Sequence, residues 1–69
     1  MIEILQNSTL IYTDGMEEQF EALRLTKRGI YIGRILRSGG KERYFECGFI
    51  SKDNVKSVIG GKKRIIEQI

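Results

Sequence analysis

The side chains that most often perform catalysis are scarce in this chain. Histidine is absent and Cys47 is the only cysteine. A Ser–His or Cys–His pair is therefore excluded, and the commonest general base is missing. One thiolate without an imidazole offers too few donors for a zinc cage, and one cysteine forms no disulfide within the chain. We expect a protein that is not an enzyme and that carries no metal or cofactor.

The carboxylates and glycines show no pattern typical of a catalytic or nucleotide site. Glu17 to Glu21 is expected to be a solvated surface, and Glu46 is expected to pair with Arg24 or Arg34 on an outward face. The Gly29 to Gly33 segment has the composition of a strand. Gly60-Gly61-Lys62-Lys63 lacks the upstream glycine of a phosphate-binding loop, so its two glycines are expected to form a tight turn.

The basic residues are the remaining functional candidates. Twelve basic and nine acidic residues give a net charge of +3, an excess compatible with nucleic-acid binding. Small barrels that bind nucleic acid combine cations, which contact phosphates, with aromatic rings, which stack on bases. Arg24 and Tyr31 are expected in cation–π contact, with Tyr31 and Tyr44 as platforms for bases. The candidate interface for RNA or DNA consists of Arg24, Lys27, Arg28, Tyr31, Arg37, Tyr44, Lys62, Lys63 and Arg64.

The same charges have a plainer explanation, because charged turns and edge strands keep a small domain soluble and block edge pairing. A module for protein–protein interaction or self-assembly is therefore the alternative function, with another protein or a second copy as partner. We expect apolar surface for it at Ile65-Ile66, at Ile69, and at a cluster of Phe20, Ile35 and Tyr44.

Length and composition predict one small domain spanning residues 1–69. Eleven isoleucines and no proline favour β-strands. Met1 to Ile4 contains no basic segment followed by an apolar run, and no stretch approaches the roughly 20 apolar residues of a membrane span. We expect a cytoplasmic protein with no membrane partner.

Two glycine-containing turns together predict one sheet. With turns at residues 26–29 and 38–41, the cross-strand pairs are Leu25–Ile30, Leu23–Ile32, Ile32–Cys47, Ile30–Phe49 and Arg37–Glu42. Cross-strand partners share a face. The predicted apolar face therefore contains Leu23, Leu25, Ile30, Ile32, Phe45, Cys47 and Phe49. Cys47 on this face would be an inert core residue.

The opposite face is expected to point outward and to carry Ala22, Arg24, Tyr31, Gly33, Glu46 and Gly48. Three large side chains gather at one end of it: Phe20, Ile35 and Tyr44. This cluster predicts that the sheet curls through a bulge at Gly33 and buries that end as well.

Residues 15–27 allow a second interpretation. Asp14-Gly15-Met16-Glu17 matches the capping-box pattern, and Met16, Phe20 and Leu23 have helical spacing. An α+β fold with a helix at residues 15–27 is therefore the alternative to an all-β fold.

The remaining segments complete a small barrel. Ile2 to Leu5 and Thr9 to Thr13 are expected to form an interrupted strand or a short hairpin. Ser51 is expected to cap one helical turn at residues 51–56, and Lys62 to Ile69 to form the last strand. Five to six short antiparallel strands with a late helical turn predict a small barrel or roll. Their order resembles that of the SH3-like and Sm-like small barrels.

Overall fold

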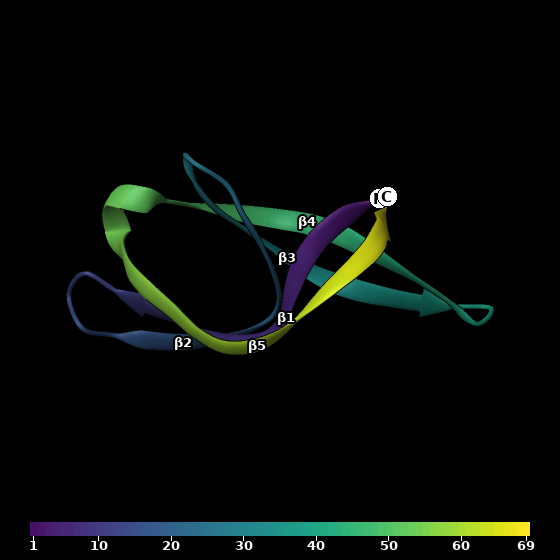
Figure 1. Cartoon of the computed structure of the whole chain (residues 1–69), viewed down its shortest axis with the longest axis horizontal. Coiled ribbons are helices and arrows are strands. Elements are labelled where there is room, and N and C mark those ends of the chain that lie inside the picture. The colour runs from purple at the N-terminus through teal and green to yellow at the C-terminus, as the bar shows by residue number, and fades with distance from the viewer.

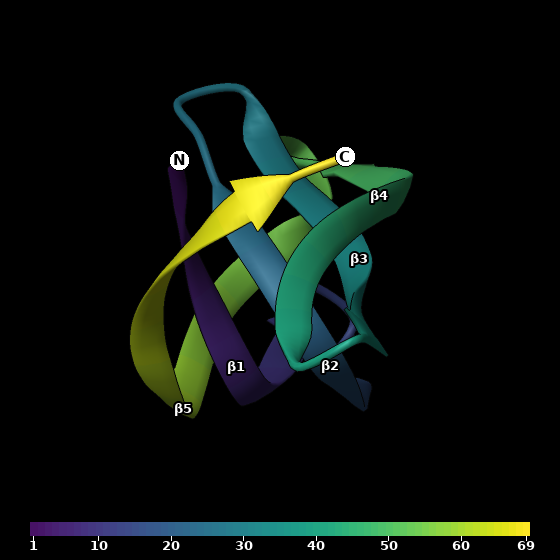
Figure 2. The same ribbon diagram turned by 90° about the vertical axis from the view of Figure 1, so that its right-hand side faces the viewer.

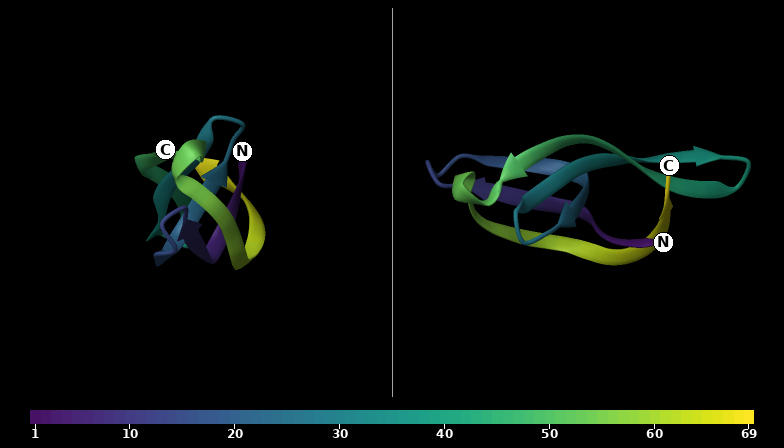
Figure 3. Two further views of the ribbon diagram at one scale, coloured as in Figure 1. Left: turned by 90° about the vertical axis from the view of Figure 1, so that its left-hand side faces the viewer. Right: turned by 90° about the horizontal axis from the view of Figure 1, so that it is seen from above.

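Five strands and one 3-10 turn make up the fold. The structure, a computed structural model, describes residues 1–69, and the principal-axis extents of the chain are 41 × 20 × 17 Å. The elements in chain order are β1 (Ile2–Tyr12), β2 (Glu17–Leu25), β3 (Gly29–Ser38), β4 (Lys41–Ser51), η1 (Lys52–Asn54) and β5 (Val55–Gln68). The β3–β4 turn lies at one end of the long axis, and the β1–β2 turn and η1 lie at the other (Figures 1 and 3). The all-β fold is confirmed.

The strands close into a ring in the order β1-β2-β3-β4-β5, which Figure 2 shows end-on. β5 is antiparallel to β1 along most of its length. β4 and β5 close the ring in parallel at two pairs alone, Arg43–Glu67 and Tyr44–Gln68. The backbone N–H of Ile69 adds one hydrogen bond to the carbonyl oxygen of Tyr44, at 3.0 Å. The predicted small barrel is therefore present, with a narrow seam.

The β2–β3 hairpin has the predicted register. Leu25 pairs with Ile30, Leu23 with Ile32, and Arg24 with Tyr31. The backbone N–H of Thr26 donates to the carbonyl oxygen of Gly29 at 2.9 Å, which closes the expected turn. The alternative helix at residues 15–27 is wrong, because Glu17–Leu25 pairs with strands on both sides.

The β3–β4 hairpin follows the predicted register only near its turn. Arg37 pairs with Glu42, and Gly33 still pairs with Glu46. A bulge then places Cys47 and Gly48 opposite the single residue Ile32, so the pairs beyond it are displaced by one residue. A shift of one residue moves side chains to the other face of a sheet. The predicted core positions of Cys47 and Phe49 are therefore wrong, and both residues are exposed.

Two apolar clusters form the core. One contains Ile4, Ala22, Ile35, Tyr44 and Ile66, and the other contains Leu10, Leu23 and Ile30 with half-buried neighbours that include Phe20 and Ile32. Ala22 and Leu23 are both fully buried although consecutive residues of a strand point to opposite faces. The barrel interior thus passes from one face of the β2–β3 sheet to the other.

This change of face explains the remaining errors on the predicted apolar face. Leu23 and Ile30 are buried there as expected, and Ile32 is half-buried. Phe45 pairs with Arg34 and lies beyond the point where the interior changes sides, so it is 44% exposed. Leu25 is also exposed, at the β2–β3 turn. The predicted curl at Gly33 is confirmed by the burial of Ile35 and Tyr44, which the bulge adjoins.

β1 and β5 bend together, and neither strand is interrupted by a turn. Each is one continuous strand, and Asn7, Gly60 and Gly61 adopt left-handed backbone conformations. Ser8 pairs with Gly60 and Gln6 pairs with Lys62, so the bend occurs at the same level in both strands. The predicted tight turn at Gly60-Gly61 is wrong, because β1 pairs with β5 on both sides of the glycines.

The late helical turn is present but shorter than expected. It covers Lys52–Asn54, and the side-chain hydroxyl of Ser51 caps it by accepting a hydrogen bond from the backbone N–H of Asp53 at 3.3 Å. Val55 follows it and packs against the second apolar cluster. This turn determines the direction in which β5 leaves β4, and it lies beside the β2–β3 turn.

Candidate nucleic-acid interface

Arg24 connects an aromatic ring to a carboxylate on the outer side of the barrel. Its guanidinium carbon lies 4.3 Å from the centre of the Tyr31 ring, so the predicted cation–π contact is present. Its Nε and Nη2 donate to the two carboxylate oxygens of Glu46 at 2.7 and 3.1 Å. This bidentate geometry fixes the plane of the guanidinium. The sequence prediction that Glu46 pairs with an arginine is confirmed.

The charge states of this pair follow from the contact. The hydrogen bond from Arg24 is the largest of several influences and lowers the pKa of Glu46 below its ordinary value, while the bond to Glu46 raises the pKa of Arg24. The hydroxyl of Tyr44 donates a further hydrogen bond to Glu46 at 3.2 Å. Burial is the main reason that the pKa of Tyr44 is raised, so its phenol stays protonated. Arg24 is therefore held in place by groups with constant charge near neutral pH.

Phe49 extends this arrangement to the surface. Its ring centre lies 4.8 Å from that of Tyr31 at an interplanar angle of 54°, and the side chain is 46% exposed. Gly29 lies beneath the ring, since a Cβ atom at this position would be 2.9 Å from Cζ of Phe49. The glycine thus leaves room for the ring to lie against the β2–β3 turn. We call Arg24, Tyr31 and Phe49 the aromatic ladder.

Three cations adjoin the aromatic ladder and take part in no ion pair. Lys27 and Arg28 occupy the β2–β3 turn, and the carbonyl oxygen of Arg28 accepts a hydrogen bond from the backbone N–H of Lys52 at 3.0 Å. All three residues are exposed, and the ion pairs of the protein involve other cations. We call Lys27, Arg28 and Lys52 the cation cluster.

The side chain of Thr26 gives the turn a defined shape. Its hydroxyl donates to the carbonyl oxygen of Gly29 at 2.9 Å and lies 3.3 Å from the backbone nitrogens of Arg28 and Gly29. Local hydrogen bonds of this kind let a threonine side chain stabilise a turn. The cation cluster is therefore presented on an ordered backbone.

The structure brings together four of the nine residues predicted to bind nucleic acid and separates the other five. Arg24, Lys27, Arg28 and Tyr31 lie in or beside the aromatic ladder. Tyr44 is fully buried, so its predicted role as a base platform is wrong. The remaining four lie elsewhere: Arg37, Lys62, Lys63 and Arg64.

These four residues divide between the β3–β4 hairpin and β5. Arg37 and Arg64 both bind Glu42, whose carboxylate oxygens lie 2.9 and 2.5 Å from their nitrogens. The hydrogen bond from Arg64 is the main cause of the lowered pKa of Glu42. Lys62 and Lys63 are exposed on β5, where Lys63 shares a shallow cleft with Leu25 at the end of β2. Arg37 and Arg64 are therefore engaged by Glu42, whereas Lys62 and Lys63 lie on a different strand from the cation cluster.

Two residues at this surface, Phe49 and Lys52, are not among the predicted binding residues. The predicted register places Phe49 in the core because it does not include the bulge at Cys47. Gly48 on β4 and Gly33 on β3 flank the bulge and are the one local signal of it. The proximity of Lys52 to the β2–β3 turn depends on how β4 ends, which residue spacing does not reveal.

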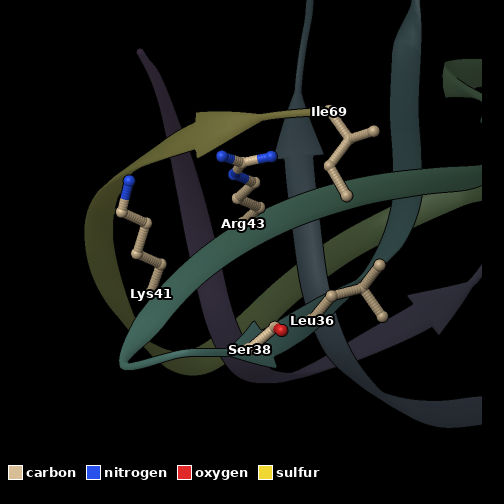
Figure 4. Close-up of a pocket in the computed structure, with 5 residues that line it drawn as sticks. All are labelled: Leu36, Ser38, Lys41, Arg43 and Ile69. Atoms are coloured by element: carbon tan, nitrogen blue, oxygen red, sulfur yellow. The ribbon is translucent and has the colours of Figure 1, made fainter.

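The surface also carries shallow clefts. One of about 360 Å³ lies on another side of Phe49 and is lined in part by Tyr12, Asp14 and Asn54. A second, of about 260 Å³, lies at the β3–β4 hairpin and is shown in Figure 4, with Leu36, Ser38, Lys41, Arg43 and Ile69 around it. Arg43 in this cleft is 3.9 Å from Glu67. Neither cleft contains the one buried hydroxyl that lacks a partner, which belongs to Ser8.

The apolar surface expected for a protein partner is largely buried. Ile35, Tyr44 and Ile66 belong to the first apolar cluster, and Phe20 is half-buried against the second. Ile65 and Ile69 are exposed as expected, at 68% and 62%. The predicted Phe20, Ile35 and Tyr44 patch is therefore wrong, whereas Ile69 lines the cleft at the β3–β4 hairpin together with Leu36.

Comparisons with protein-family models, curated proteins and solved structures find no match to this chain. The structure contains no group of three potential metal-ligating side chains. It has no helix with the length and apolar character needed to cross a membrane.

Proposed function

We propose that this protein is a small nucleic-acid-binding module that uses the outer side of the β2–β3 turn. The observation that carries the proposal is the position of the cation cluster against the aromatic ladder. Cations supply phosphate contacts, and aromatic rings supply contacts to bases. Of the predicted interface, Lys27 and Arg28 keep their proposed contacts to phosphate, and Arg24 and Tyr31 remain part of the surface. Phe49 and Lys52 join them.

The electrostatics support phosphate binding at the turn. Because Lys27, Arg28 and Lys52 have no carboxylate partner, a phosphate that binds there breaks no ion pair within the protein. Counterions released from the nucleic acid then provide much of the binding free energy. Arg24 contributes differently, since Glu46 already neutralises it. Its role is to hold Tyr31.

A titration of labelled RNA and DNA against the purified protein tests this proposal. Affinity is expected to fall on a log–log line between about 50 and 200 mM salt, with a slope near −2 if three phosphates of a single strand are neutralised. Lys27→Gln combined with Arg28→Gln should reduce that slope by roughly 1.4.

Arg34→Gln combined with Lys41→Gln is the matched control. It removes the same net charge from exposed positions on the β3–β4 hairpin that are in no ion pair, and should leave the slope unchanged. Equal effects of the two double variants would show that general charge, not this surface, attracts nucleic acid. Absence of binding at low salt would remove the proposal.

A further inference from the structure

The exposed ring of Phe49 has a different environment from the ring of Tyr31. Tyr31 is half-buried, with the Arg24 guanidinium over its ring and Phe49 beside it. Phe49 rests on Gly29 and Tyr31 and is 46% exposed. The aromatic ladder therefore ends at one accessible ring, that of Phe49, which packs against Gly29 and Tyr31.

We infer that the ligand of this surface is a single-stranded nucleic acid, one base of which stacks on Phe49. This inference rests on the proposed function and adds the class of nucleic acid to it. In a duplex each base is stacked between its neighbours, so an aromatic side chain gains access to a base face only in a single strand, a loop or a flipped nucleotide. A supported, accessible ring next to unpaired cations fits the unpaired strand.

The charges around Phe49 give the strand a direction of approach. The cation cluster lies on the side of Gly29, whereas Asp14 lines the cleft on another side of the ring. Phosphates are attracted to the first side and repelled by the second. The backbone of the bound strand therefore passes over the β2–β3 turn while the base covers Phe49.

Phe45 offers a matched control on the same strand. It is 44% exposed, close to the 46% of Phe49, and it pairs with a basic residue, Arg34, that is in no ion pair. The bulge between them places Phe45 and Phe49 on opposite faces of the β3–β4 sheet. Only Phe49 lies against the turn that carries Lys27 and Arg28.

The test measures fluorescence anisotropy of labelled 12-nucleotide probes: oligo(U) RNA, oligo(dT) DNA, and a mixed-sequence DNA duplex of the same length. The wild-type protein is compared with Phe49→Ala and Phe45→Ala. Phe49→Leu retains apolar contact with Gly29 but lacks the ring, and Phe49→Trp retains a ring. Circular dichroism of each variant confirms that it is folded.

The inference predicts tighter binding of the single strands than of the duplex. Phe49→Ala and Phe49→Leu should weaken single-strand binding by roughly 5- to 150-fold, the usual effect of losing one stacked base. Phe45→Ala should change it by less than about twofold, and Phe49→Trp should preserve it. A preference for RNA or for DNA would show which of the two the protein binds. Either preference would support the inference.

Three results would overturn the inference, and they distinguish it from the proposed function. Duplex binding as tight as single-strand binding, or equal losses in Phe45→Ala and Phe49→Ala, would reject stacking on Phe49 while the proposed phosphate-binding surface stands. No binding of any probe at low salt would reject both proposals together.

Discussion

Arg24 and Glu46 connect β2 and β4, two strands that are not hydrogen-bonded to each other. β2 and β4 each pair with β3, and the Arg24–Glu46 ion pair crosses β3 at Gly33, with Nε 2.7 Å from the carboxylate oxygen. Ala22 and Glu46 are the two ladder partners of Gly33, so no β3 side chain separates the charged groups at this level. The pair therefore connects three strands where the barrel interior changes from one face of the sheet to the other.

Replacing Glu46 by glutamine should weaken this connection. The neutral amide keeps the shape of the side chain but turns charge-assisted hydrogen bonds into neutral ones, a loss of about 1 kcal/mol in the free energy of unfolding. Urea denaturation measures it. Glu17→Gln, at an exposed position with no ion pair, is the control and should stay within about 0.5 kcal/mol of wild type. Equal stabilities of the two variants would contradict the structural role of the pair.

Acidification should destabilise the protein through the same carboxylate. Because the pKa of Glu46 is lowered in the folded state, the unfolded chain takes up the proton first as the pH falls. The stabilisation is complete above the unfolded carboxylate pKa of about 4.3 and is lost as the pH falls through the lower folded pKa. Glu42, whose pKa is also lowered, acts in the same direction. The unfolding free energy should decline below about pH 5, less steeply in Glu46→Gln. Parallel profiles would exclude the pair as a source of the pH dependence.

Gly33 should tolerate no side chain. A Cβ atom there would lie 2.5 Å from the carbonyl oxygen of Phe45 and would collide with the buried ring of Tyr44. Gly33→Ala is expected to cost at least about 2 kcal/mol, because neither the backbone nor a buried ring can move aside. In Gly48→Ala, the added methyl would be 3.8 Å from Ile32, an ordinary contact, so stability should hold or rise by about 0.5 kcal/mol. Thermal unfolding of both variants checks this, and a stable Gly33→Ala would contradict the packing described.

The seam between β4 and β5 should depend on Arg64 more than on Arg37. Both bind Glu42, but the Arg64 side chain is 28% exposed and reaches from β5, whereas Arg37 is 55% exposed and lies on the same hairpin as Glu42. Arg64→Ala should therefore accelerate hydrogen exchange of the Ile69 amide, which bonds to Tyr44 across the seam. Arg37→Ala should leave that rate nearly unchanged. The reverse order would show that the seam is held by other contacts.

The sequence predicted what depends on local pairing. The turn at residues 26–29 fixes the Leu25–Ile30 pair, and the Arg24–Tyr31 contact follows from counting outward from it. The same counting from residues 38–41 is correct as far as Gly33–Glu46 and then fails at the bulge. A bulge depends on how strongly the whole sheet coils, which adjacent residues do not determine.

Two errors in the site follow from that displacement. It moved Phe49 from the predicted core to the surface and made Cys47 an exposed residue. The alternation of side chains correctly predicts that Tyr44 is on the face opposite Phe45, but Ile4 and Ile66, which are remote in sequence, cover that face around Tyr44. Which end of a twisted sheet is covered depends on contacts remote in sequence, so the candidate interface was only half predicted.

A titration followed by two-dimensional ¹H–¹⁵N NMR tests the central claim most directly, with single-stranded oligo(U) added to labelled protein at low salt. Binding at the aromatic ladder and cation cluster predicts the largest amide shifts at Arg28, Gly29, Tyr31, Phe49 and Lys52, with small shifts at Lys41 and Arg43 beside the β3–β4 turn (Figure 1). Largest shifts beside the β3–β4 turn, or no shifts at saturating oligonucleotide, would contradict it.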